Sequence, residues 1–392
     1  MEVTKKVLVP TRPGVAMHVN TIYRYPAGVE LLQFVHETVA SDTGGMFYRR
    51  FSGDNGSTWT ELEKVYEPVT KPEGDYRWGE TTFVVDPKKN VLVHFYNYHL
   101  YPGGYFTHQA RKYYRVFYRI SFDGGKTFTA SKQVIQKGGD EIHWADGVEY
   151  GKNGLGISFC RPVINRNGQL LVPLRKSPID EKYVSNKVML SAGCVIGTWK
   201  NDGLEWETSK FVVVPEEQST RGLYEPAIEV LPDGKVLMIC RGSNVQAKDN
   251  IPGRKWYVLS SDGGYTWSEP NVLTYDDSSS FYAPSTGSIL IRHSVNKKLY
   301  WFTNIIPMNS DGNRPRYPLQ VCEIDEVTIA VKKETVAVID DKHEGDSDLL
   351  QLSNFKVYED RESHEFVLTM ARIQEKGKEL TSPAYEYRIK VY

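Results

Sequence analysis

Polar and charged side chains precede six similar turns in this sequence. Counting back about nine residues from each turn gives Met17, His18, Asn20, Arg77, Trp78, Glu80, Cys160, Arg161, Tyr224, Glu225, Tyr282, Ser285, Ser353 and Asn354. Buried charges are costly unless they are paired, so this set would make a poor packed core. Functional clefts tolerate such groups. We therefore interpret the set as the lining of a site, in preference to a water-filled channel with solvated side chains.

The charged members of this set indicate acid–base chemistry on an anionic compound. Arginine binds carboxylate or sulfate through two parallel hydrogen bonds, which makes Arg161 a substrate-binding candidate. Glu80, Tyr224 and Asn354 are further polar candidates for binding. Glu225, shielded in a cleft, can act as a base or a nucleophile.

Six copies of a turn followed by an apolar strand define the elements that must position these residues. The copies read AGVELLQF, KKNVLVHF, RNGQLLVP, PDGKVLMI, NKKLYWFT and RESHEFVL, starting at Ala27, Lys88, Arg166, Pro232, Asn296 and Arg361. Such spacing is typical of four-stranded propeller blades, whose innermost strands run along one central channel. The last blade is one strand short, and the N-terminal KKVLVP can complete it. We predict an all-β, six-bladed β-propeller forming a single domain over residues 1–392, its ring closed by the N-terminal strand joining the C-terminal blade.

A second repeat, Ser-x-Asp-x-Gly-x-Thr-aromatic, supports the same count. It occurs at Ser52–Trp59, Ser121–Phe128 and Ser260–Trp267, with degenerate copies at Lys200–Trp206 and around Asp325. The chemistry is that of a tight hairpin, in which Asp accepts backbone N–H groups and Gly permits positive φ. These Asp-box hairpins lie far apart on the outer side of each blade, so we assign them no catalytic role.

The Asp boxes, the six repeats and the segment Ser219–Arg241 resemble the sialidase (neuraminidase) superfamily. In that family a glutamate polarises a tyrosine nucleophile, and an arginine triad binds the carboxylate of sialic acid. The resemblance implies these roles for Glu225 and Arg241. It also makes Arg316, or Arg314, a triad candidate and Asp42 the acid/base residue.

Two positions depart from the family pattern. His18 stands where the first triad arginine is expected, and neither Arg12 nor Arg24 fits that place. The segment from Leu352 to Phe355 has no tyrosine where the family carries its nucleophile, and Tyr358 lies too deep. The chain is therefore expected to be a divergent member with altered chemistry.

Our leading hypothesis is an exo-acting, sialidase-like glycoside hydrolase that removes a terminal acidic or polar sugar from a glycan. Glu225 would serve as base or nucleophile and Asp42 as acid, because two carboxyl groups across the glycosidic bond are the minimum for hydrolysis. One alternative is a polysaccharide lyase on uronic-acid glycans with a His18/Tyr224 pair and an arginine that neutralises the carboxylate. Another is a non-catalytic glycan-binding propeller.

Composition excludes several other classes. The net charge is −1 with no basic block, so no nucleic-acid partner is expected. No apolar run approaches a membrane span, and the cysteines, among them Cys160, follow neither a disulfide nor a zinc pattern. Residues 1–10 lack the apolar part of a secretory signal, which fits a cytoplasmic protein or one whose signal was removed. We expect no cofactor and no metal.

Three histidines invite a metal interpretation that strand geometry disfavours. On one strand His94 and His99 would point to opposite faces, and His108 falls near a Tyr- and Gly-rich rim loop expected from Tyr98 to Tyr105. The aromatic residues of that loop could stack on sugar rings. His143 and Asp146 lie in a loop over residues 138–156 that is long enough to reach the channel mouth.

Overall fold

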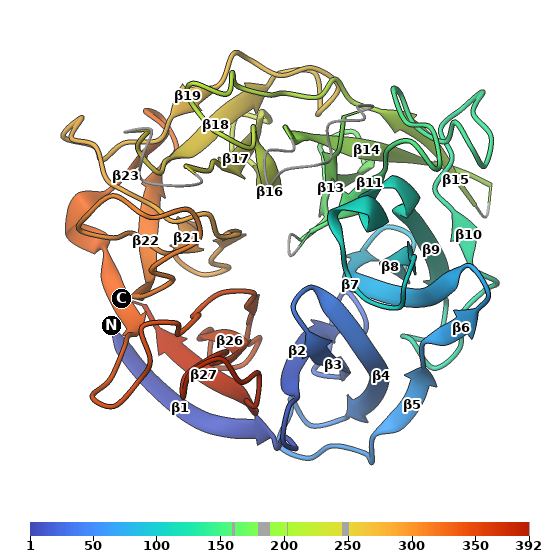
Figure 1. Cartoon of the computed structure of the whole chain (residues 1–392), viewed down its shortest axis with the longest axis horizontal. Coiled ribbons are helices and arrows are strands. Elements are labelled where there is room, and N and C mark those ends of the chain that lie inside the picture. The colour runs from blue at the N-terminus through green and yellow to red at the C-terminus, as the bar shows by residue number, and fades with distance from the viewer. Residues whose placement is uncertain (159–160, 179–188, 202, 245–250, 392) are drawn as a thin grey trace.

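The computed structural model describes residues 1–158, 161–178, 189–201, 203–244 and 251–391. Within these ranges the chain is all-β and forms six sheets arranged in a ring, as the turn repeats predicted (Figure 1). The helices among the described residues are the short 3-10 helices η1 (His108–Tyr113) and η3 (Lys333–Thr335). None of the helices described is long and apolar enough to cross a membrane.

The first three sheets follow one another along the chain. Blade 1 contains β2 (Ala16–Tyr23), β3 (Leu31–Ala40), β4 (Thr43–Ser52) and β5 (Glu63–Tyr66). Blade 2 contains β6 (Val69–Lys71), β7 (Gly74–Asp86), β8 (Val91–Tyr101), β9 (Arg115–Ser121) and β10 (Lys132–Gln133). Blade 3 contains β11 (Leu155–Ile157), β12 (Val163–Ile164), β13 (Leu170–Lys176), β14 (Ser191–Lys200) and β15 (Gly203–Thr208).

The remaining three sheets complete the ring. Blade 4 contains β16 (Tyr224–Val230), β17 (Val236–Arg241), β18 (Lys255–Ser260) and β19 (Asn271–Val272). Blade 5 contains β20 (Ile289–Arg292), β21 (Leu299–Thr303), β22 (Leu319–Asp325), β23 (Ala330–Val331) and β24 (Ala337–Asp340). Blade 6 contains β25 (Lys356–Glu359), β26 (Phe366–Ala371), β27 (Ala384–Lys390) and the N-terminal β1 (Glu2–Val9), which pairs antiparallel with β27.

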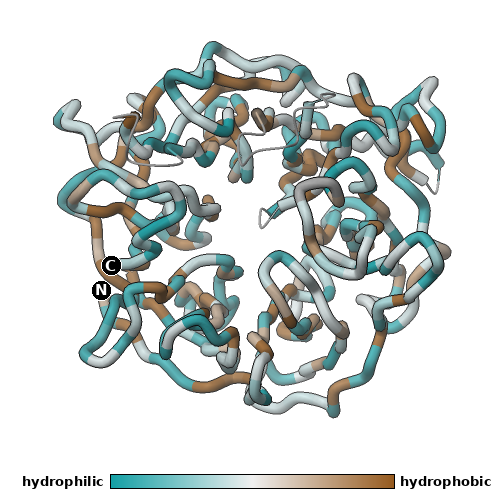
Figure 2. The backbone as a smooth tube through the Cα atoms, viewed as in Figure 1, coloured by the Kyte–Doolittle hydropathy of each residue, from teal (hydrophilic) through white to brown (hydrophobic). Residues whose placement is uncertain are grey.

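Apolar side chains fill the spaces between neighbouring blades. One cluster joins blades 2 and 3 around Trp144 and Trp206, and others join blades 3 and 4, 4 and 5, and 5 and 6. Because each sheet is covered on both faces, strands such as β17 are buried along their whole length. Figure 2 shows hydrophobic segments along the blades and hydrophilic segments in many of the connecting loops.

The Asp-box hairpins have the geometry that their chemistry predicts. The Asp54 carboxylate accepts hydrogen bonds from the Thr58 N–H (2.8 Å) and hydroxyl (2.5 Å), and Asp123 and Asp262 repeat the pattern. Asp325 accepts two backbone N–H groups in the degenerate copy of blade 5. In the copy of blade 3, Asp202 lies outside the described residues.

Two details of the rim differ from expectation. Strand β8 extends to Tyr101, so the rim loop begins at residue 102 instead of 98, and η1 follows it. The loop over residues 138–156 buries Trp144 between blades 2 and 3, while His143 stays exposed beside Asp140. Cys194, Cys240 and Cys322 are buried free thiols, and Cys160 lies outside the described residues.

Candidate functional site

A cavity of about 350 Å³ occupies one end of the central channel. It receives side chains from the inner strands of blades 1 and 2, from β13 of blade 3, from the loop between β21 and β22 of blade 5, and from the loop that precedes β25 of blade 6. Six residues named as candidates from the sequence line it: His18, Asp42, Glu80, Arg314, Arg316 and Asn354. The convergence of these residues from separate blades is what the propeller topology requires.

The other four predicted residues lie elsewhere. Tyr224, Glu225 and Arg241 are buried beside the cavity and do not line it. Arg161 lines a second cavity of about 350 Å³ at the opposite end of the channel, where its guanidinium group lies 2.6 Å from Glu229. Neither member of the predicted Glu225–Arg241 pair therefore lines the first cavity. Blade 2 contributes more residues to its lining than the sequence indicated.

Two arginines that sequence reasoning missed, Arg111 and Arg175, also line the first cavity. Arg111 belongs to η1, which the sequence did not predict. Arg175 ends the strand segment RNGQLLVPLR, and Arg241 ends PDGKVLMICR at the same repeat position. Comparing these two repeats position by position would have identified Arg175.

The basic wall of the cavity keeps its positive charge at neutral pH. Burial, and then the guanidinium group of Arg241, lower the pKa of Arg316 to about 10. Burial and Arg221 lower the pKa of Arg111 to a similar value of about 10. Burial also disfavours the charge of Arg175, but nearby carboxylates, Glu80 foremost, raise its pKa above the ordinary value. With Arg314, four arginines line this one cavity, which suits a carboxylate or sulfate ligand.

Asp42 and Glu80 are the carboxyl groups that line this cavity within the described part of the chain. Asp42 occupies the β3–β4 turn with a φ of 50°, and Tyr101 donates a hydrogen bond to its backbone carbonyl (3.1 Å). Among the described residues, its carboxylate has no hydrogen-bond or ion-pair partner. Glu80 is held by the Asn97 side chain at 2.7 Å. Residues in the sparsely populated left-handed region tend to cluster at functional sites, and Asn354 (φ 61°) is a second example here.

Histidines and tyrosines complete the wall. His18 stacks on His36 with ring centroids 5.0 Å apart. Burial, and then the charge of Lys356, lower the pKa of His18 to about 4, so its imidazole is neutral at neutral pH. His99 stacks on Tyr114 and lies 3.1 Å from the Tyr101 hydroxyl through its Nδ1 atom.

Several residues expected to lie off the site do so. Arg24 donates hydrogen bonds to the carbonyls of Asp123 and Gly124 in the neighbouring Asp box, and Arg12 pairs with Glu37. Tyr358 lines the second cavity, with Lys356 common to both cavities.

The histidines of β8 and of the loop after β10 point to different parts of the molecule. His94 packs in the core beside Phe83, whereas His99 faces the first cavity, so the prediction of opposite faces is confirmed. His143 lines neither cavity. Across the described ranges, no group of three or more His, Cys, Asp or Glu residues is arranged to hold a metal ion.

The ring of six sheets and its polar central cavity define a six-bladed β-propeller of the sialidase-like type. Residues 46–345 match the BNR repeat-like domain, and the chain belongs to that family. No curated protein matches the sequence.

Solved structures with similar folds cover nearly all of this chain. A Dyadobacter fermentans protein of unknown function has a TM-score of 0.65 at 15% identity, covering 99% of both chains. A mutant of the NanB sialidase from Streptococcus pneumoniae has a TM-score of 0.64 at 13% identity, covering 98% of this chain and 70% of that one. The α-L-arabinofuranosidase Arb93A from Fusarium graminearum has a TM-score of 0.58 at 12% identity, covering 98% and 97%. At sequence identities of 12–15%, this similarity shows the fold alone.

Proposed function

We propose that this protein is an exo-acting glycoside hydrolase that removes a terminal acidic sugar from a glycan. The observation that carries the proposal is that two carboxyl groups, Asp42 and Glu80, line the same cavity as four arginines, Arg111, Arg175, Arg314 and Arg316. The sialidases and the arabinofuranosidase of similar fold support a carbohydrate substrate by analogy.

Substrate binding rests on the basic wall. Arg111, Arg175 and Arg316 would hold the anionic group of the sugar through charge-assisted hydrogen bonds. Asn354 and the uncharged imidazole of His18 offer polar atoms to its hydroxyl groups. A cavity of about 350 Å³ is at the small end of ligand sites, which suits the end of a chain more than its middle.

Bond cleavage needs one proton donor and one base or nucleophile. In our proposal the protonated Asp42 carboxyl group transfers its proton to the glycosidic oxygen as the bond to the anomeric carbon breaks. Glu80 accepts a proton from the attacking water, whose oxygen becomes the new anomeric hydroxyl group. The hydrogen bond from Asn97 fixes the orientation of Glu80 for this step.

Asp42→Asn and Glu80→Gln test the proposal. Each variant should lower kcat on aryl glycosides of acidic sugars by about 100-fold or more, because general acid–base groups contribute that much. Arg161→Gln, which removes an arginine from the opposite cavity, is the matched control and should leave kcat unchanged. Wild-type turnover in both carboxyl variants would refute the assignment.

A second function, elimination on uronic-acid polysaccharides, is favoured by the His99–Tyr101 pair. Both side chains line the arginine-walled cavity, 3.1 Å apart, whereas Tyr224 of the originally expected His18/Tyr224 pair does not line it. In such a lyase the base removes the proton next to the carboxylate, and the acid protonates the leaving oxygen. Ultraviolet absorbance of an unsaturated uronate would identify this reaction. Glycan binding with no product by mass spectrometry would instead indicate a binding propeller.

A further inference from the structure

Strand β16 contains an irregularity at the residue predicted to be catalytic. The pairing of β16 with β17 shifts between Tyr224 and Ala227, and Glu225 has a φ of 49°. A bulge in a strand redirects a side chain that regular pleating would send elsewhere. A left-handed glutamate persists only where its surroundings hold it there.

The Glu225 carboxylate is held by two arginines from two blades. One oxygen lies 2.5 Å from Nη1 of Arg241, and the other lies 3.7 Å from Nη1 of Arg175. Arg175 is also 3.7 Å from Glu80, and Arg241 donates a hydrogen bond to the Asn313 side chain (2.9 Å). Opposite charges thus alternate from Glu80 of blade 2 to Arg241 of blade 4, with Glu225 between the two arginines.

The position of Glu225 disfavours direct contact with substrate. The residue is 4% exposed and is absent from the lining of the first cavity, which Arg175 does line. A general base must come within hydrogen-bond reach of the proton it removes. Both oxygens of Glu225 instead face guanidinium groups, and Arg241 and then Arg175 hold the pKa of this carboxyl group below its ordinary value although burial opposes the charge.

We infer that Glu225 is a positioning residue that fixes Arg175 at the cavity wall and Arg241 behind it. This inference rests on the proposed function, because it gives Arg175 the task of binding the anionic group. Removing the negative charge would leave Arg175, Arg241 and Arg316 close together without the carboxylate that separates them. The wall would then rearrange and bind the anion less well.

Glu225→Gln tests this inference because it keeps the shape of the side chain and removes its charge. We expect KM for an acidic aryl glycoside to rise about tenfold, with kcat changed by less than about fivefold, since the loss is in ground-state binding. The pH profile of kcat should keep both limbs, because Asp42 and Glu80 remain. Glu229→Gln is the matched control: it lies on the same strand and pairs with Arg161 at the other cavity, so KM should not change.

Two further measurements separate the possible outcomes. Glu225→Asp retains the charge and should keep kcat near the wild-type value. This variant still tests the inference if Glu225→Gln fails to fold. A drop in kcat of about 1000-fold in either variant, with azide restoring turnover, would show that Glu225 is a nucleophile and overturn the inference. Calorimetry with free glucuronic and sialic acids measures binding without turnover. Weaker binding by Glu225→Gln than by the wild type would support the positioning role, even if the wild type proves inactive and the proposed function fails. Equal binding to both proteins would overturn it.

Discussion

His18 lines the cavity as a neutral imidazole, and this has a consequence for stability at acid pH. Burial is the main cause that lowers its pKa from 6.5 to about 4, followed by the charge of Lys356. Between these values the unfolded chain binds a proton that the folded protein does not. The free energy of unfolding therefore falls as pH decreases from about 6.5 to about 4.

We predict that His18→Gln loses less stability on acidification than the wild type. The difference between pH 7 and pH 4.5 should be smaller in the variant by about 2–3 kcal/mol, the linkage value of a shift of this size. Urea unfolding followed by circular dichroism at both pH values measures it. His143→Gln, at an exposed position, is the control and should behave as the wild type. Identical losses in all three proteins would contradict the prediction.

Counting residues along the turn repeats reached the cavity wall in some blades and overlooked the second strands. Counting back from the turns found the inner-strand residues His18 and Glu80. The tenth residue of the turn repeat falls on the second strand of a blade, and in the first four blades it is His36, Asn97, Arg175 and Arg241. Each of these residues lines the cavity or contacts a residue of the site. The sequence alone does not show that the second strands also reach the channel, because this depends on where each inner strand ends.

At the rim, Arg77 connects two elements: the β3–β4 turn that carries Asp42 and the loop that follows β8 of blade 2. Its guanidinium group donates to the carbonyls of Gly44 (2.7 Å) and Gly104 (3.3 Å). The backbone N–H of Phe106 also donates to the Thr43 hydroxyl (3.3 Å). The position of Asp42 therefore depends on contacts between two blades as well as on its own turn.

Arg77→Met should release this turn and weaken proton donation by Asp42. Because a good leaving group needs little acid assistance, we expect kcat to fall about tenfold on glycosides with poor leaving groups and to change little on dinitrophenyl glycosides. Arg49→Met is the matched control, since Arg49 also joins blade 1 to blade 2, but at the Asp box around Gly125. An equal loss on both substrate types would show a general effect on folding instead.

Elements whose shape follows from local turn chemistry were predictable, and those set by long-range pairing were not. Gly or Asp in the turn marks five of the six hairpins between the inner and second strands, and Asn296 stands in the turn of the blade 5 hairpin. The bulge at Glu225 and the extension of β8 to Tyr101 depend on register with the neighbouring strand. No pattern within either segment specifies that register.

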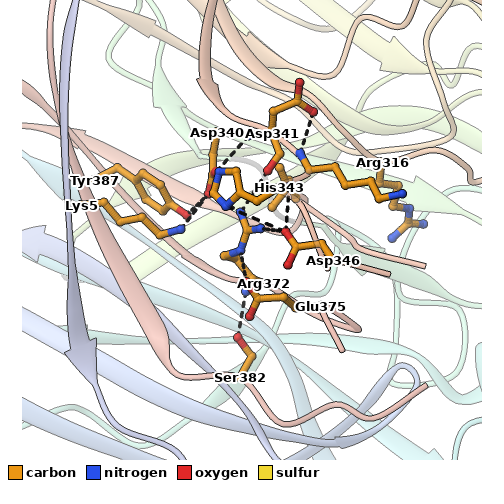
Figure 3. A network of polar contacts seen from close by, with 12 residues as sticks. Lys5, Arg316, Asp340, Asp341, His343, Asp346, Arg372, Glu375, Ser382 and Tyr387 are labelled. Carbon is orange, nitrogen blue, oxygen red and sulfur yellow. Dashed lines mark hydrogen bonds and ion pairs between the residues drawn. The ribbon is translucent and has the colours of Figure 1, made fainter. Parts of the chain in front are cut away.

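At the scale of the whole molecule, the ring is closed by pairing between the two ends of the chain. Strand β1 pairs with β27 from Glu2↔Lys390 to Val9↔Ala384. A buried ionic network reinforces this closure (Figure 3). Asp340, at the end of β24, forms an ion pair with Lys5 of β1 (Nζ to Oδ2, 3.1 Å) and accepts a hydrogen bond from the Tyr387 hydroxyl of β27. Blades 5 and 6 and the N-terminal strand thus share one carboxylate.

Arg372 holds the centre of this network. Its fully buried guanidinium group lies 2.6 Å from Asp340, 2.5 Å from Asp346 and 2.7 Å from Glu375. Arg372→Met would leave these carboxylates buried without their main counter-charge. Breaking a buried ion pair from one side is strongly destabilising, so we expect the free energy of unfolding to fall by about 3–5 kcal/mol.

Lys5→Met provides the comparison for this variant. Lys5 pairs with the same Asp340 but is 30% exposed, so its loss should cost less than about 1 kcal/mol. Urea unfolding at neutral pH measures both variants, and size-exclusion chromatography checks whether a loosened ring exposes the edge of β27 to a second molecule. Equal stabilities of the two variants would mean that the network does not depend on Arg372. A large loss confined to Arg372→Met would show that the buried guanidinium group stabilises the closed ring more than the partly exposed Lys5–Asp340 ion pair does.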